Sequence, residues 1–277
     1  MQKLFLLLLL VTVSFSGCQT RKLPAVVHTQ YSYYKSYKTE NNQLQINLQN
    51  PLHCPLRVWV KSPDKEMQTV FDAINPVVIK AQQDTVLYFP VAGNTNYSIS
   101  FASRLGDTSK EIKPIALALP FPKNKAYRVI QANNTNYTHN SDWARYAVDF
   151  DMAVNDTICA ATRGFVVGVI DDYKLGGTGA EWKPYANYIT IYEPNSGLFT
   201  QYVHLVYKGS LVKIGDIIES GQPIALSGNT GQTNAPHLHF NCLVPANTND
   251  GLKSVPFEFL GGYKSQELKN GDYLENN

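Results

Sequence analysis

Cysteine is scarce in this sequence, which has four such residues in 277. Cys54, Cys159 and Cys242 lie in separate apolar runs, too few and too scattered for a disulfide framework. We expect small buried hydrophobic side chains at these positions, and a bridge between Cys159 and Cys242 stays open as the alternative in an exported protein. The sequence also lacks a CxxC pair and an HExxH segment. These absences exclude zinc fingers and the commonest metalloprotease helix.

Charged side chains are also few. They make up 17% of the sequence, the formal net charge is +2, and neither a basic block nor an acidic tail occurs. We therefore expect no nucleic-acid partner, because such a partner requires a basic footprint. The sequence is instead rich in tyrosine, with 17 residues, and in short apolar runs. This composition favours β structure, and the length suits two domains.

No stretch after residue 20 approaches the roughly 20 apolar residues that a membrane helix needs. The first residues, MQKLFLLLLLVTVSFSGCQT, combine one basic residue with a short apolar run, which is typical of an export signal. The segment FSGC resembles a bacterial lipobox and predicts a signal peptide at residues 1–17 and lipidation of Cys18. The lipid would hold an exported protein at a membrane, facing the periplasm or cell envelope. The alternative is a plain signal peptide with an incidental cysteine.

The pattern changes twice along the chain. Residues 18–42 are polar and tyrosine-rich without a sustained period, and we predict a tether. Residues 43–120 contain short alternating segments, such as QLQINLQ, LRVWVKS, TVLYFPV and YSISFAS, separated by Pro, Asn, Asp or Gly. This pattern is typical of a small β-sandwich. It contains no cluster of catalytic residue types, so we predict an accessory or spacer role.

The segment ALPFPKNK marks a domain boundary near residue 120. Residues 121–262 again contain strand candidates with glycine-bearing turns, and no amphipathic helix of three turns is evident. We predict an antiparallel β-sheet domain there, followed by a C-terminal tail at residues 263–277. The predicted fold class is therefore all-β, with an N-terminal β-sandwich before the second domain.

Two histidines one residue apart mark the candidate site. A strand over the segment HLHF directs His237 and His239 to one face and the residues between and after them to the other. The same period places Tyr202 and His204 on one face of FTQYVHLV, and it places Asp149 on the polar face of RYAVDFDM. Polar faces backed by apolar ones thus recur in three strands.

One more histidine, His139 in the segment NYTHNSDW, precedes the aspartate strand. A catalytic zinc takes three protein ligands and keeps an open position, and His and Asp suit it. Five candidate groups exceed that number, which leaves two imidazoles for proton handling and charge stabilisation. The alternative is that each polar residue is separately structural, and it weakens with every additional strand that carries one.

The order of several segments resembles the lysostaphin or LytM-type zinc peptidases, which cut peptide cross-links of bacterial cell walls. The segments are YAVDF, AATRGFVVGV, NYITIY, TQYVHL, LVKIGDIIESGQPIALSGNTG and PHLHF, within about residues 122 to 245. The resemblance implies that Asp149 and His239 are zinc ligands and that His204 and His237 are catalytic histidines. It also implies that Asn187 lines the substrate-binding site.

The third zinc ligand departs from the commonest family form, in which a histidine stands four residues before the aspartate. Arg145 occupies that position here. The segment HNSDWARYAVDF resembles members whose histidine lies farther upstream, so the resemblance implies His139 as the third ligand.

The predicted function that follows from the resemblance is a zinc metalloendopeptidase that hydrolyses peptidoglycan stem peptides or cross-links through a metal-activated water. Its partners would be peptidoglycan peptides and, through Cys18, a membrane. The alternative is a catalytically inert LytM-like protein that binds the wall or activates another cell-wall hydrolase. Inert relatives are expected to lack zinc or catalytic positions. An adhesin that acts through the N-terminal sandwich has no residue pattern in its favour.

The polar segment DDYKLGGTGAEWKPY, residues 171–185, is longer than a hairpin requires and carries several aromatic residues. With Tyr188, which follows it, the segment would either wall a peptide groove or form an ordinary surface insertion.

Overall fold

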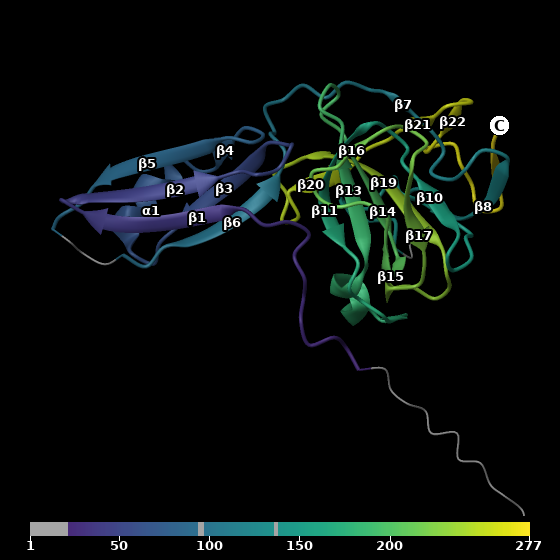
Figure 1. Cartoon of the computed structure of the whole chain (residues 1–277), viewed down its shortest axis with the longest axis horizontal. Coiled ribbons are helices and arrows are strands. Elements are labelled where there is room, and N and C mark those ends of the chain that lie inside the picture. The colour runs from purple at the N-terminus through teal and green to yellow at the C-terminus, as the bar shows by residue number, and fades with distance from the viewer. Residues whose placement is uncertain (1–21, 94–96, 136–137) are drawn as a thin grey trace, which may run out of the picture.

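The computed structural model describes residues 22–93, 97–135 and 138–277. The predicted signal peptide and Cys18 therefore lie outside the described residues. Figure 1 shows a narrow N-terminal region (residues 34–105) that projects from a broader C-terminal region (residues 116–277). Both regions consist mainly of strands, which confirms the all-β fold class. Among the described residues, no helix is long and apolar enough to span a membrane.

Two three-stranded antiparallel sheets and one short helix form the N-terminal region. The first sheet has the order β1 (Tyr34–Glu40), β2 (Gln43–Gln49), β5 (Asp84–Pro90), the second has the order β4 (Val77–Ile79), β3 (Leu56–Lys61), β6 (Ser100–Leu105), and the helix is α1 (Lys65–Asp72). Both sheets and the helix contribute side chains to one apolar core. The four strands expected from alternating segments are confirmed as β2, β3, β5 and β6. The β-sandwich architecture itself stays a prediction.

Helix α1 is an addition to the expected strands. Asp64 caps its N-terminus and accepts a hydrogen bond of 2.8 Å from the Met67 backbone N–H, which satisfies one of the free donors of the first turn. Met67 and Phe71, four residues apart on one face, are buried in the core. The helix is therefore held by one cap and one apolar pair.

Strands also replace two segments that we predicted to be irregular. Part of the predicted tether, Tyr34–Glu40, pairs with β2 as strand β1. Part of the predicted tail, Tyr273–Asn276, forms β23 and pairs with β8 (Lys125–Gln131). Both strands end their sheets, and β1 has no buried side chain. An edge strand without a buried face shows no alternation of apolar and polar residues, which explains why the sequence did not predict β1.

The described part of the C-terminal region is organised around a nine-stranded antiparallel sheet. Its order is β16 (Ile217–Ile218), β11 (Gly164–Ile170), β13 (Tyr188–Tyr192), β14 (Phe199–Val203), β19 (Leu238–Pro245), β9 (Val148–Phe150), β8, β23, with β20 (Leu252–Ser254) paired to β19.

Smaller sheets complete this region. They comprise β10 (Thr157–Cys159), β17 (Pro223–Ser227) and β15 (Leu205–Ser210), then β7 (Ala116–Leu117), β21 (Glu258–Phe259) and β22 (Tyr263–Lys264), and the pair β12 (Gly176–Gly177) and β18 (Gly231–Gln232). A 3-10 helix, η1 (Ala180–Tyr185), lies in the insertion that follows β11. The cysteines Cys54, Cys159 and Cys242 are free and buried, so the hydrophobic interpretation holds and the alternative bridge does not form.

The two faces of the nine-stranded sheet differ in chemistry. Residues directly opposite each other in neighbouring strands share a face. Tyr202 and Phe240 lie opposite each other and belong to the main apolar core. The other face carries a row formed by Tyr188, Val203, His239 and Asp149, so this is the face that holds the candidate site.

Two further rows continue this site face along the same strands. The middle row is polar and comprises Thr190, Gln201 and Asn241, and the far row is apolar and comprises Tyr192, Phe199 and Leu243. The far row belongs to the apolar core of the N-terminal region. The N-terminal region therefore packs on the same face of the sheet that carries Asp149 and His239.

Candidate active site

Strand register brings the first two candidate ligands together. His239 in β19 lies opposite Asp149 in β9, and the distance from His239 Nδ1 to Asp149 Oδ1 is 2.9 Å. Both side chains are buried. They share one face because the alternation in both strands is regular here, as predicted from the sequence.

His139 reaches the same point from the loop before β9. Its Nδ1–H donates to the Ala132 carbonyl at 3.0 Å, which leaves Nε2 as the unprotonated ring nitrogen. That Nε2 lies 3.2 Å from His239 Nδ1 and 3.2 Å from Asp149 Oδ1. The ring is fully buried. The structure thus gathers the three residues that the sequence analysis grouped as ligands.

The spacing of the three atoms matches what a small tetrahedral metal ion requires. Bonds of 2.0–2.1 Å to zinc place neighbouring tetrahedral ligands about 3.3 Å apart. The three separations here are 2.9, 3.2 and 3.2 Å. Among the described residues, His139, Asp149 and His239 form a group able to hold a metal ion. Two imidazoles and one carboxylate are also the donor types that suit such an ion.

Burial and mutual charge set the protonation of this group. Burial opposes the charge of Asp149, but His139, His239 and His237 outweigh it and hold the pKa of Asp149 well below its usual range. Burial lowers the pKa of His239 although Asp149 opposes this effect. Burial also acts to lower the pKa of His139, yet the Asp149 carboxylate raises it overall. Asp149 is therefore an ionised carboxylate buried among three imidazoles.

His204 joins the site through an irregular backbone. It separates β14 from β15 and has φ +69°, a left-handed conformation that is uncommon outside glycine. Its Nδ1–H donates to the Thr230 carbonyl at 2.7 Å. Its ring centroid lies 4.5 Å from that of His237 and 6.0 Å from that of His239. His204 is therefore a close neighbour of the candidate ligands, as expected from the sequence.

The predicted pairing of Tyr202 with His204 on one face is wrong. Tyr202 is fully buried, its ring lies 5.4 Å from that of Phe240, and its hydroxyl accepts from the Ala161 N–H at 2.7 Å. The turn at His204 ends the alternation, so the two side chains separate. Tyr202 supports the core, and His204 alone faces the site.

His237 enters just before β19, where it forms a bridge with Gly228. Its Nδ1–H donates to the Ala235 carbonyl at 2.8 Å, and its Nε2 lies 3.7 Å from Asp149 Oδ2.

Burial lowers the pKa of His204, and the neighbouring His237 and His239 lower it further. In His204 and His237 alike, a backbone carbonyl holds Nδ1 and leaves Nε2 as a base. These orienting carbonyls carry no sequence signal.

Asn187, predicted from the resemblance to line the substrate-binding site, lies close to His204 in the chain fold. The side chain is fully buried. Its Oδ1 accepts from the Tyr173 N–H at 2.9 Å, and its Nδ2 donates to the carbonyls of Tyr173, Leu205 and Val206 at 2.8, 3.3 and 3.3 Å. The side chain thus binds the Tyr173 backbone and the carbonyls of the two residues that follow His204. The assignment of Asn187 to the substrate-binding site stays a prediction.

The insertion at residues 171–185 is packed against the domain. Tyr173 and Trp182 are buried, and the ring of Tyr185 lies 5.5 Å from Tyr173 and 6.3 Å from Trp182. Strand β12 in this segment pairs with β18. The aromatic rings therefore hold the insertion in place, and Tyr188, which follows it, lines two adjoining hollows.

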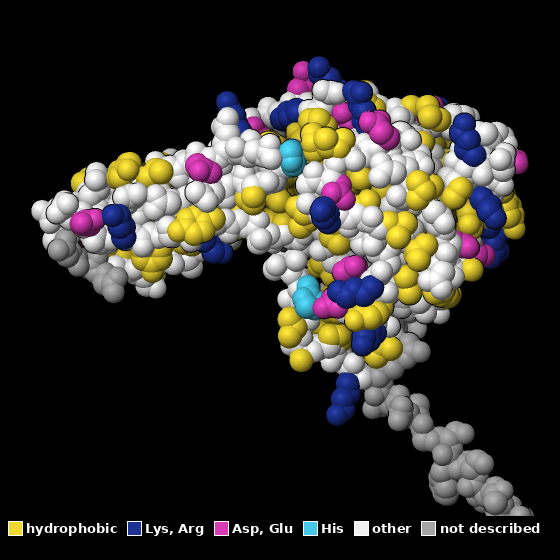
Figure 2. All heavy atoms as spheres, in the orientation of Figure 1, with side chains coloured by type: hydrophobic (Ala, Val, Ile, Leu, Met, Phe, Trp, Pro, Cys, Tyr) yellow, Lys and Arg dark blue, Asp and Glu magenta, His cyan; other side chains and the backbone are white. Residues whose placement is uncertain are grey.

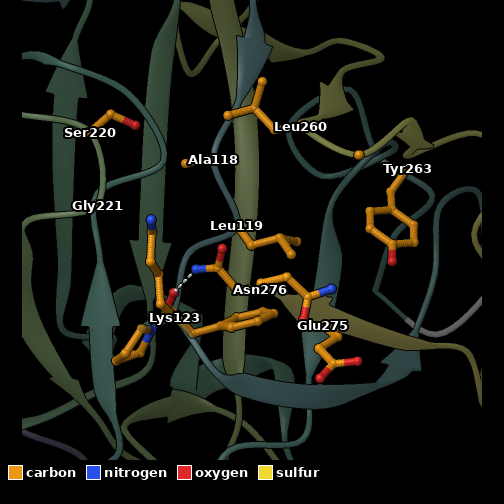
Figure 3. Close-up of a pocket in the computed structure, with 13 residues that line it drawn as sticks. Ala118, Leu119, Lys123, Ser220, Gly221, Leu260, Tyr263, Glu275 and Asn276 are labelled. Carbon is orange, nitrogen blue, oxygen red and sulfur yellow. Dashed lines mark hydrogen bonds between the residues drawn. The ribbon is translucent and has the colours of Figure 1, made fainter.

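A separate hollow of about 810 Å³ lies elsewhere on the C-terminal region. Figure 3 shows Leu119, Leu260 and Tyr263 around it, together with Lys123 and Asn276, whose side-chain amide donates a hydrogen bond to the Phe121 carbonyl. Neither Asp149 nor any histidine lines this hollow. It is therefore distinct from the candidate active site.

Comparisons with known proteins agree with this site. Residues 144–250 match the family model described as peptidase family M23. A Buchnera aphidicola protein described as an uncharacterized metalloprotease is 30% identical over 164 residues, which cover 57% of this chain and 40% of that protein. Lysostaphin of Staphylococcus simulans is 35% identical over 122 residues, covering 43% and 22%. Peptidoglycan DD-endopeptidase ShyB of Vibrio cholerae is 44% identical over 71 residues, covering 26% and 16%. The chain thus spans less than half the length of these relatives.

Among solved structures, the catalytic domain of lysostaphin from Staphylococcus simulans is 27% identical, with a TM-score of 0.34, and the match covers 47% of this chain and 88% of that one. A zinc-containing peptidase from Vibrio cholerae is 18% identical, with a TM-score of 0.37, covering 83% and 79%.

Proposed function

We propose that this protein is a zinc-dependent endopeptidase that hydrolyses peptide bonds in peptidoglycan stem peptides or cross-links. The match of residues 144–250 to the model of peptidase family M23 supports this proposal. The observation that carries the proposal is the triangle of His139 Nε2, Asp149 Oδ1 and His239 Nδ1, with sides of 2.9 to 3.2 Å. Its size and donor types fit zinc. His139 lies five residues before the matched region, so the loop that precedes strand β9 supplies the third candidate ligand.

Zinc bound there would supply Lewis-acid chemistry, polarising the scissile carbonyl and lowering the pKa of a water molecule. The protein's own contribution comes from His204 and His237. Each presents Nε2 as a base, since a backbone carbonyl occupies Nδ1. One imidazole can accept the proton of the attacking water, and the other, once protonated, can donate a hydrogen bond to the developing oxyanion. The 4.5 Å between their ring centroids lets both act on one reacting carbonyl.

The substrate class comes from the relatives. Lysostaphin is described as an antimicrobial peptidase, ALE-1 of Staphylococcus capitis as a glycyl-glycine endopeptidase, and ShyB as a peptidoglycan DD-endopeptidase. These names favour peptide cross-links of the bacterial wall for this chain as well. Cys18 as a lipid-bearing residue would keep the exported enzyme at a membrane surface facing that substrate.

An inert wall-binding protein of the same family is disfavoured by the site. The three candidate ligands and both catalytic histidines lie together in one buried group, whereas an inert relative would be expected to have lost some of them.

The decisive experiment incubates purified protein, loaded with zinc, with isolated peptidoglycan sacculi and identifies the released fragments by mass spectrometry. Fragments that end at a newly cleaved peptide bond are expected. The His239→Ala variant is the control, since it removes one of three metal ligands and should release none. If the zinc-loaded wild-type protein binds sacculi but releases no fragments, the inert alternative replaces this proposal.

A further inference from the structure

The N-terminal region is fixed to the C-terminal region by a buried arginine. Arg57 in β3 is fully buried and donates hydrogen bonds to the carbonyls of Gly106 at 3.1 Å, Ala246 at 3.0 Å and Gly251 at 2.5 Å. Its partners belong to both regions. The apolar row of Tyr192, Phe199 and Leu243 adds shared core packing, so the end of β6 has a defined position over the site face.

Two adjoining hollows lie at this junction. Their volumes are about 280 and 440 Å³. Both are lined by Gln30, Tyr31, Ser103, Arg104 and Tyr188, so together they form one groove, which we call the junction groove. One wall is the N-terminal segment before β1, a second is β6, and Tyr188 belongs to the sheet.

The junction groove begins next to the candidate active site. Tyr188 is in the same row as His239, separated from it only by Val203, which places the two backbones about 10 Å apart. Trp143, which lines the groove, follows His139 in the same loop, and its carbonyl accepts a hydrogen bond from Asn241. The site row and the apolar row under the N-terminal region are about 13 Å apart along β19, a length that about four extended peptide residues span.

Arg104, at the N-terminal side of the groove, has the geometry of an anion-binding group. Its Nε donates to the Asn249 carbonyl and its Nη1 to the Ser103 carbonyl, each at 2.7 Å, which fixes the guanidinium plane. Among the described residues, no carboxylate oxygen lies within 4.0 Å of it and Nη2 has no hydrogen-bond partner. Lys35 lines the larger of the two hollows, and Asp250, an exposed residue that follows Asn249, lines the smaller one together with Arg104.

We propose that the junction groove binds a carboxylate-bearing part of the wall peptide and that Arg104 is the residue that recognises the carboxylate. This inference rests on the proposed endopeptidase function and gives the N-terminal region a part in substrate selection. A planar, half-buried guanidinium with free N–H groups is suited to a carboxylate. The test uses a cross-linked stem-peptide dimer purified from sacculi and the same dimer after its carboxylates have been converted to carboxamides by carbodiimide and ammonia.

The full-length, zinc-loaded protein should prefer the acid dimer, with kcat/KM higher by about 10- to 100-fold, the usual worth of a charge-assisted hydrogen bond. In Arg104→Gln this preference should fall to about threefold or less, mainly through KM, and Arg104→Lys should lie between. Arg163→Gln is the matched control, because it removes the same charge from an exposed side chain that does not line the groove. Equal thermal unfolding midpoints and zinc contents verify that the variants are folded.

A preference for the acid dimer that survives in Arg104→Gln, or one that Arg163→Gln abolishes equally, would overturn the assignment. Calorimetric binding of the acid and amide dimers to the same proteins provides a readout that does not require turnover. If the wild-type protein hydrolyses neither dimer, the proposed function fails. The binding difference between wild type and Arg104→Gln then still decides whether Arg104 recognises a carboxylate.

Discussion

Replacing Asn187 by alanine should reduce stability and disturb His204, although Asn187 contacts no substrate in our account. The side chain makes four hydrogen bonds, to the N–H and carbonyl of Tyr173 and to the carbonyls of Leu205 and Val206. Its own N–H donates to the Thr230 hydroxyl at 3.0 Å. Thr230 in turn supplies the carbonyl that orients His204. Asn187 thus holds the backbone that follows His204 and, through Thr230, the carbonyl that orients its ring.

The magnitude follows from these contacts. Each hydrogen bond contributes about 1 kcal/mol net, and the Tyr173 N–H left buried without a partner adds about 1–3 kcal/mol. Relaxation of the site recovers part of this sum, so Asn187→Ala should lower the free energy of unfolding by about 3–5 kcal/mol. Asn187→Asp should also destabilise the protein, because it keeps the acceptor for Tyr173 but directs a carboxylate oxygen at backbone carbonyls.

The measurement is urea unfolding of the purified variants, followed by kcat and KM for stem-peptide hydrolysis under conditions where each is folded. Asn47→Ala is the matched control, since the partly exposed Asn47 bonds only Ser36 and Gln45 side chains and should change stability by less than about 1 kcal/mol. If Asn187→Ala has wild-type stability and a raised KM, the positioning role is refuted and Asn187 is a substrate-binding residue after all.

The remaining predictions concern the anchor and the metal. Cys18→Ser should lose the acyl mass and leave the membrane fraction, and a variant that stays membrane-bound with unchanged mass would contradict the lipoprotein prediction. The purified protein should hold one zinc ion per chain, and a chelator should abolish hydrolysis until zinc is restored. His139→Ala should lose metal affinity because two protein ligands remain, whereas full zinc content and activity would make His139 a mere loop residue. His239→Ala should lose zinc and activity together, while His237→Ala should keep zinc and lose turnover by about 10²- to 10⁴-fold. The zinc content and the hydrolysis rate of both folded variants are measured. If zinc were lost from His237→Ala alone, His237 would be the metal ligand and His239 the proton-transfer residue.

Strands with one buried face were predictable because alternation records the burial of every second side chain. Leu44, Ile46 and Leu48 in β2 show this pattern, and all three are buried. Helix α1 was missed because it is short, although Asp64 before an apolar pair at Met67 and Phe71 is a usable signal. The packing of the N-terminal region over the site face could not be predicted. It depends on pairings between distant residues, such as Arg57 with the loop after β19.

For the site, the sequence predicted which residues lie close together better than it predicted the backbone conformation that brings them there. Asp149 and His239 were placed correctly because each lies in a regular strand, where period two fixes the face. His139 lies in a loop, where no period applies, so the sequence offered it as one of five candidate groups and only the family resemblance implied its role as a ligand. Figure 2 adds that the visible surface carries charges of both signs without a large single-sign patch, as the low net charge suggested. The surface therefore gives no indication of the buried histidine group.

His204, which we propose to be catalytic, shows why one side chain of a site can depart from the alternation that places its neighbours. Regular alternation would give His204 the same face as Tyr202 and direct its imidazole into the apolar core, where a buried polar ring is costly without partners. The left-handed backbone of His204, at φ +69°, ends β14 at Val203 and turns the imidazole toward the site. Such a conformation costs about 1–3 kcal/mol and persists only where its surroundings determine it. Here the Thr230 carbonyl holds the ring and the Asn187 side chain holds the following backbone. The strain is therefore local to the residue whose Nε2 must face the substrate, and the contacts that maintain it come from two other segments of the chain.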